Sequence, residues 1–139
     1  MKTIVIYYSF SQKTAAIAKA KAKEENADLL ELLDLKKPNI IKAFILGAYR
    51  AIAQKKVNLK PFSIDFDQYE KIIFAMPVWG SMPAPAINNV IDILPAGKNV
   101  EMILTSASGD SKGASIKVGK VILAKGSHLT KTTDIKTNK

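Results

Sequence analysis

Hydroxyl and amide side chains directly follow the first apolar run of the chain, where they are suited to binding an anion. The run Ile4 to Tyr8 is β-branched and aromatic without polar alternation, which is typical of a strand buried on both faces. Residues 14–23 are rich in alanine and have a helical composition. The polar side chains between these two segments are those of Ser9, Ser11, Gln12 and Thr14.

A strand that turns directly into a helix points free backbone N–H groups and the positive end of the helix dipole at one spot. The hydroxyls of residues 9, 11 and 14 add hydrogen bonds to that spot. A phosphate monoester fits such a site. The alternative is an ordinary strand-to-helix loop, in which Ser11 is only a helix N-cap.

Two further loops follow apolar runs. Residues 77–83 come directly after the run 71–76, and their prolines and glycine predict a stiff, irregular loop that carries Trp79. Residues 105–111 follow the run 100–104 and are small enough for their backbone to meet the edge of a heterocycle. Open parallel sheets bind ligands at the carboxyl ends of their strands. The three loops together therefore predict a site for a phosphorylated aromatic ligand.

The chain lacks the residues that cysteine, metal or nucleophilic chemistry requires. The chain has no cysteine, no spacing typical of metal ligands and no paired nucleophile and base. Its one histidine, His128, is interpreted as a surface residue of an edge strand rather than a catalytic group. We therefore expect binding chemistry, with no catalytic side chain and no metal.

The elements that position the loops alternate along the chain. Residues 27–35 also fit a helix, but alternation with the flanking elements favours a strand. The amphipathic segment 39–55 is expected to pack on the sheet, with a place on a membrane surface as the alternative. The expected strands are 4–8, 27–35, 71–76, 100–104 and 128–135, and the expected helices are 14–23, 39–55, 84–94 and 112–125. This pattern predicts one α/β domain, 1–139, built on an open parallel sheet.

The composition indicates a globular protein with a basic surface. Of the 139 residues 47% are hydrophobic, which excludes a disordered chain, and neither a signal peptide nor a membrane-spanning run is evident. A cytoplasmic location is expected. The net charge of +9 favours anionic partners. Lysine outnumbers arginine 20 to 1, which argues against base-specific nucleic-acid recognition, although the lysine-rich end leaves non-specific binding open.

Four places in the chain resemble the short-chain, flavodoxin-like FMN proteins. The segment 8–14 is similar to the phosphate loop of that family, and Pro77-Val78-Trp79-Gly80 is similar to the flavin loop of one subgroup. Gly47 to Ala51 matches an insertion of the same subgroup, and Thr105 to Gly109 stands where the loop beside the pyrimidine end of the flavin occurs.

The resemblance implies a flavodoxin-like, five-stranded parallel sheet of order 2-1-3-4-5, with helices on both faces and FMN as the cofactor. It implies that the FMN phosphate is held by Ser9, Ser11, Gln12, Lys13 and Thr14. The residues implied to flank the isoalloxazine are Pro77, Val78, Trp79, Gly80 and Ser81. Those implied to close the other side are Ser106, Ala107, Ser108, Gly109 and Asp110. The implied function is electron transfer or a flavin-dependent reductase, with an acidic redox partner or NAD(P)H.

Two departures from the family pattern bear on function. Gln12 stands where the family has glycine, and only residues 137–139 follow the last expected strand, where the family has a helix. Without that helix we expect an exposed apolar face, and from it a homodimer. The alternative to a redox protein is a flavin-free, flavodoxin-like binding or oligomerisation module.

Overall fold

The computed structural model describes residues 2–9, 12–33, 59–79, 82–111 and 113–137. The expected helix 39–55, with the Gly47 to Ala51 segment, lies outside the described residues. In the described part of the chain, no helix is both long and apolar enough to cross a membrane.

Five strands form a parallel sheet in the order β2-β1-β3-β5-β6. They are β1 (Lys2–Tyr8), β2 (Asp28–Leu32), β3 (Tyr69–Trp79), β5 (Asn99–Ser106) and β6 (His128–Lys136). A short strand, β4 (Met82–Pro83), pairs antiparallel with the end of β3. With this added strand left out, the expected order 2-1-3-4-5 is confirmed. The uniform burial of Ile4 to Tyr8 also confirms that β1 is covered on both faces.

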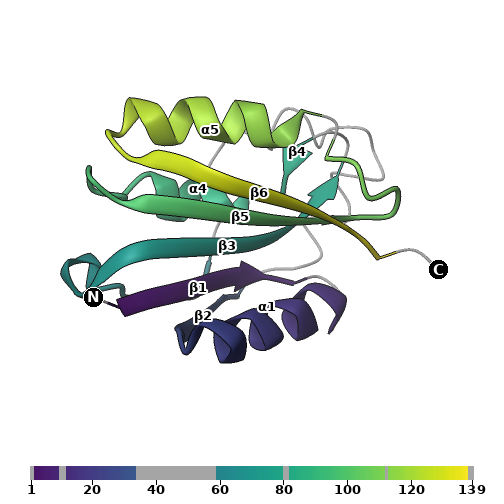
Figure 1. Ribbon diagram of the computed structural model, residues 1–139, viewed down its shortest axis with the longest axis horizontal. Helices are drawn as coiled ribbons and strands as arrows, with labels where there is room; N and C mark the ends of the chain where they lie inside the picture. Colours follow the sequence, from purple (N-terminus) through teal and green to yellow (C-terminus); the bar gives the residue numbers. More distant parts are fainter. Residues whose placement is uncertain (1, 10–11, 34–58, 80–81, 112, 138–139) are drawn as a thin grey trace.

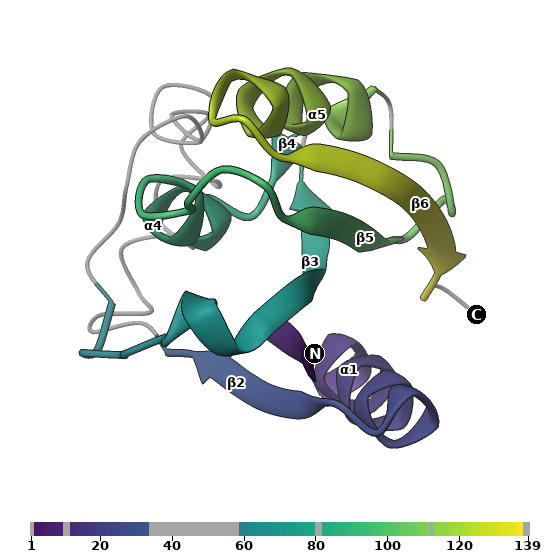
Figure 2. The ribbon, with the colours of Figure 1, turned by 60° about the vertical axis from the view of Figure 1, so that its left-hand side comes forward.

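Helices cover the two faces of the sheet unequally (Figures 1 and 2). On one face, α1 (Gln12–Glu25) packs alanines against Val5, Ile73 and Ile103 in a small core. On the other, α4 (Ala86–Ile91) and α5 (Ala114–Ala124) close a larger core with Phe74 and Met102. A short 3-10 helix, η1 (Phe66–Gln68), precedes β3.

Strand β3 extends through Trp79, so the expectation of an irregular loop from residue 77 onward is wrong for residues 77–79 and for the paired residues of β4. Pro77 pairs in register with Thr105 of β5. Its carbonyl accepts a hydrogen bond from the N–H of Ala84, at 2.8 Å, on the opposite side of the strand. In a strand, the N–H and the carbonyl of one residue point to the same side, so the nitrogen of Pro77 faces away from β5. On that side the pairing of β3 with β1 ends at Tyr7, which pairs with Ala75, so β1 does not reach Pro77. The proline therefore removes no bond from the sheet.

Two helices are shorter than expected. Helix α4 spans only residues 86–91, with Pro85 as its N-cap residue. Helix α5 begins after Gly113, whose φ of +84° is left-handed, so this glycine precedes the helix instead of lying inside it. The strand expected at 128–135 is confirmed as β6, and His128 is exposed, as expected.

The open face beside α1 is less apolar than expected. On this side, Ile103 is only 4% exposed and Ile135 packs as a partly buried residue against the α1 core. Among the large exposed apolar side chains of the described residues, Leu29 lies on the α1 side of the sheet, because it pairs in register with Val5 of the α1 core. The others are Leu33, Ile93, Ile116, Val121 and Leu123. The described residues of this face therefore expose less apolar surface than expected, and the homodimer stays a prediction.

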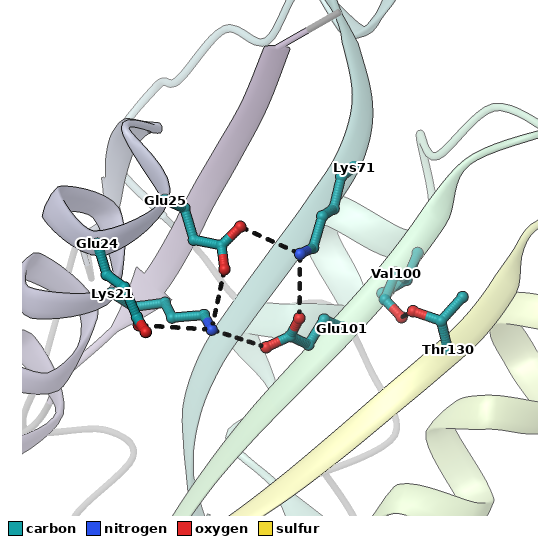
Figure 3. A network of polar contacts seen from close by, with 7 residues as sticks. All are labelled: Lys21, Glu24, Glu25, Lys71, Val100, Glu101 and Thr130. Atoms are coloured by element: carbon teal, nitrogen blue, oxygen red, sulfur yellow. Dashed lines mark hydrogen bonds and ion pairs between the residues drawn. The ribbon is translucent and has the colours of Figure 1, made fainter.

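A network of charged side chains lies on this face (Figure 3). Lys21 and Glu25 come from α1, Lys71 from β3 and Glu101 from β5. Each lysine contacts both carboxylates: Lys21 Nζ lies 3.2 Å from Glu25 and 3.4 Å from Glu101, and Lys71 Nζ lies 3.2 Å and 3.3 Å from the same two groups. The network compensates the charge of Glu101, which is only 4% exposed within its strand.

Candidate functional site

The carboxyl ends of β1, β3 and β5 lie at the same end of the molecule (Figure 1), because adjacent strands in this part of the sheet are parallel. The loops after these three strands contain the site residues predicted from the sequence. In the fold, this edge is also where the chain turns from β1 into α1, so backbone N–H groups of the first helical turn open toward it.

Ser9 follows directly after β1, and the surroundings of its hydroxyl in the described part of the chain bear on ligand binding. Its Oγ is buried and makes no hydrogen bond to any described residue. Buried hydroxyls are almost always hydrogen-bonded in folded proteins. A polar ligand group at this turn fits the unpaired hydroxyl. Ser11, the other hydroxyl predicted here, lies outside the described residues.

The first turn of α1 places three predicted residues in different surroundings. Gln12 and Lys13 are exposed, and the Nζ of Lys13 donates a hydrogen bond of 2.7 Å to the carbonyl of Thr137, just after β6. Thr14 is buried, and its Oγ1 lies 2.8 Å from Oγ1 of Thr105, the next-to-last residue of β5. The structure thus brings the start of α1 against the ends of both β5 and β6.

The end of β3 forms the second part of the rim. Pro77 is buried and Val78 packs as a partly buried residue against the larger core. The backbone pairs Val78 with Pro83 and Trp79 with Met82. Gly80 and Ser81, between the paired strands, and the side chain of Trp79 lie outside the described residues, so their predicted contacts with a flavin stay predictions.

The third loop is held closed by its own serines. The Oγ of Ser106 accepts a hydrogen bond from the N–H of Gly109 at 3.0 Å, and the Oγ of Ser108 accepts one from the N–H of Asp110 at 3.2 Å. These two N–H groups, which the sequence offered to a ligand, are therefore already engaged. Ala107, Ser108 and Asp110 are exposed on this loop.

Gly109 is required where this loop meets the end of β6. Its φ is +80°, and a Cβ at this position would lie 3.1 Å from the Cβ of Lys136. The carbonyl of Ser106 also accepts a hydrogen bond of 2.9 Å from the N–H of Thr137. Sequence reasoning missed this support from the end of β6, because no signal in one segment shows which other segment packs on it.

A separate apolar groove of about 440 Å³ lies between α5 and β6. It is lined by Ser115, Ile116, Gly119, Leu123, His128, Leu129 and Thr132. None of these residues belongs to the site predicted from the sequence. Among the described residues there is also no cluster of side chains that could hold a metal ion.

Comparisons with known proteins agree with this architecture. No protein-family model matches the chain, and no curated protein sequence matches it. A candidate flavoprotein from Bacteroides uniformis has a similar structure, with a TM-score of 0.81 and 20% identity over 99% of this chain and 92% of its own. A flavoprotein from Lactobacillus acidophilus, solved in complex with FMN, has a TM-score of 0.72 and 23% identity over 94% of this chain and 91% of its own.

More distant similarity extends to a named flavodoxin. The flavodoxin of Streptococcus pneumoniae has a TM-score of 0.58 and 11% identity over all of this chain and 87% of its own. The sheet order and these neighbours define an open, doubly wound α/β protein. The chain has the flavodoxin-like fold, and the resemblance to flavodoxin-like FMN proteins is confirmed at the level of the fold.

Proposed function

We propose that the chain binds FMN at the rim formed by the ends of β1, β3 and β5, and works as a redox protein, either an electron carrier or a flavin-dependent reductase. The observation that carries this proposal is the buried Oγ of Ser9 before α1, which has no hydrogen-bond partner among the residues that the structure describes. A phosphate there would accept hydrogen bonds from this hydroxyl and from N–H groups of the first helical turn.

The other residues fit a flavin phosphate and ring at this rim. Lys13 supplies a positive charge at the start of α1, and the exposed loop 107–110 provides a second wall. The Lactobacillus acidophilus flavoprotein, which was solved in complex with FMN, shares the fold across most of the chain. When bound, FMN supplies one- and two-electron redox chemistry, while the protein positions it.

Titration of the purified protein with FMN tests the proposal through quenching of flavin fluorescence. We expect saturable binding with one FMN per chain. Ser9→Ala is expected to weaken FMN binding roughly 10- to 100-fold, since a hydrogen bond to a charged group contributes roughly 1.5–3 kcal/mol. Ser63→Ala, at an exposed serine away from the rim, is the matched control and should change nothing. Wild-type protein that fails to bind FMN would refute the proposal.

A flavin-free binding module is the second candidate function. It is favoured by the hydrogen bonds that already occupy Lys13 and the two N–H groups of the third loop. In that case purified protein is colourless and stays so after incubation with FMN. The same titration therefore separates the two candidates.

The electron donor or partner is expected to be anionic. The net charge is +9, and the exposed lysines of α5 and β6 include Lys117, Lys120 and Lys131. Such a surface attracts acidic proteins and pyridine nucleotides, and salt weakens the attraction. We expect FMN-loaded protein to be reduced by NAD(P)H or by an acidic reductase at a rate that falls as salt is added. A rate independent of salt would contradict this role of the charge.

A further inference from the structure

Thr14 and Thr105 form a buried pair of hydroxyls beneath the rim. Their Oγ1 atoms lie 2.8 Å apart, and the two residues are only 3% and 2% exposed. Thr14 is the third residue of α1, and Thr105 directly precedes the loop that begins at Ser106. The pair therefore links the phosphate end of the proposed site to the loop on its other side.

The direction of this hydrogen bond decides what Thr14 offers to a ligand. Each threonine hydroxyl has one hydrogen to donate. Among the described residues, the carbonyl of Met76 is a second possible acceptor for Thr105, at 3.5 Å. That separation is long for an O–H···O bond, which is normally 2.5–3.0 Å. Donation by the Thr105 hydroxyl is therefore most favourable toward Oγ1 of Thr14, at 2.8 Å.

When Thr105 donates to Thr14, the hydrogen of Thr14 is left for another acceptor. A phosphate monoester carries only acceptor oxygens in its dianionic form, so it favours this arrangement over the reverse one. In the reverse arrangement, Thr14 donates to Thr105 and presents only lone pairs, which would repel the anion.

We propose that Thr105 is a positioning residue for the phosphate: it donates its hydrogen to Thr14, and Thr14 donates to the phosphate of the ligand. This inference rests on the proposed FMN function and deepens it, because it assigns a specificity for phosphorylated over unphosphorylated flavin to a residue of β5. In this arrangement Thr105 does not contact the ligand and acts on it only through Thr14.

The test compares the affinities of FMN and riboflavin, which share the ring system but differ in the phosphate. Thr105→Val keeps the shape of the side chain and removes the donor. We expect the Kd for FMN to rise five- to tenfold while the Kd for riboflavin changes less than twofold. Thr105→Ser restores the hydroxyl and should return the FMN affinity to within threefold of wild type.

Further variants keep the outcome interpretable. Thr130→Val removes another threonine hydroxyl, bonded to the carbonyl of Val100 away from the rim, and should leave both affinities unchanged. Thr14→Val should show the same selective loss of FMN affinity as Thr105→Val, and the double variant should be no worse than Thr14→Val alone. If Thr105→Val does not fold, Thr105→Ala replaces it, with the same selective loss of FMN affinity expected.

Different results overturn the proposed function and the positioning role of Thr105. Wild-type protein that binds neither flavin overturns the proposed function, and the positioning role with it. Wild-type protein that binds FMN, together with a Thr105→Val variant that loses FMN and riboflavin equally or loses neither, overturns the positioning role alone.

Discussion

The Nζ of Lys21 lies 3.4 Å from Oε2 of Glu101, which fastens the second half of α1 to the middle of β5 (Figure 3). The first turn of the same helix is attached to the end of β5 through Thr14 and Thr105. Helix α1 is thus held to one strand at two levels. This double attachment fixes the direction in which its N-terminal N–H groups open onto the rim.

The first prediction concerns the buried carboxylate of this contact. Glu101→Gln removes the charge that both lysines share and should lower the free energy of unfolding by about 1–2 kcal/mol. We expect less than the roughly 3–5 kcal/mol of a fully buried pair, because the lysine side chains are 16% and 30% exposed. Urea unfolding measures the change. Glu24→Gln is the control, since Glu24 is 71% exposed and should matter little. Equal effects of the two substitutions would contradict the prediction.

The second prediction concerns acid stability. The hydrogen bond from Lys71, joined by that from Lys21, lowers the pKa of Glu25 below its ordinary value of 4.5. Because the folded state holds this proton less tightly than the unfolded state, the contribution to stability is present above pH 4.5 and is lost as the pH falls through the lowered pKa. In urea unfolding between pH 6 and pH 3, the difference between wild type and Glu25→Gln should shrink toward the acid end. A difference that stays constant would refute this.

The third prediction concerns the hydroxyl of Tyr69, which donates a hydrogen bond of 2.6 Å to Oδ2 of Asp28. This bond, together with burial, raises the pKa of Tyr69 from 10.0 to about 12. Its stabilising contribution is therefore complete below pH 10 and disappears as the pH rises to about 12. Tyr69→Phe should cost about 1 kcal/mol at neutral pH, because Asp28 is exposed and the bond is partly screened. It should also remove a tyrosine that ionises near pH 12 from an ultraviolet titration.

The fourth prediction compares two glycines joined across one contact, in which the N–H of Gly97 donates to the carbonyl of Gly126 at 2.9 Å. Both have a left-handed φ, +84° and +86°. A Cβ on Gly97 meets nothing within 4 Å, whereas one on Gly126 would lie 2.7 Å from the Cβ of Ala96. Gly97→Ala should cost about 1 kcal/mol from backbone strain alone, and Gly126→Ala about 1–3 kcal/mol more. Thermal unfolding of the two variants measures the difference, and equal melting temperatures would contradict it.

The parts of the fold that could be predicted were those in which one segment carries its own signal. The run Ile4 to Tyr8 of β1 is apolar, which predicts burial on both faces, and the alternation of elements predicts an open parallel sheet. The order of its strands was implied by the family resemblance alone. The continuation of β3 through Pro77 could not be predicted from composition. It depends on which side of the proline lacks a neighbouring strand, and only the register shows that.

The candidate site could likewise be predicted only in part. The three loops could be placed at one edge from the sequence, because each follows a parallel strand. The partners of their side chains could not, since Lys13 contacts Thr137 and Thr14 contacts Thr105, which are far away in the chain. The burial of Glu101 could not be predicted from the sequence either, because the two lysines that contact its carboxylate come from α1 and β3.

Strand β6 forms one border of the sheet, and it departs from regular pairing at one residue. Leu129 pairs with Val100 and Lys131 with Glu101, so Thr130 is an extra residue that folds back to hydrogen-bond the carbonyl of Val100. Such a bulge, flanked by a lysine, interrupts the straight ladder that a foreign strand would need for docking. The interruption protects this border against edge-to-edge aggregation and against the first step of fibril growth.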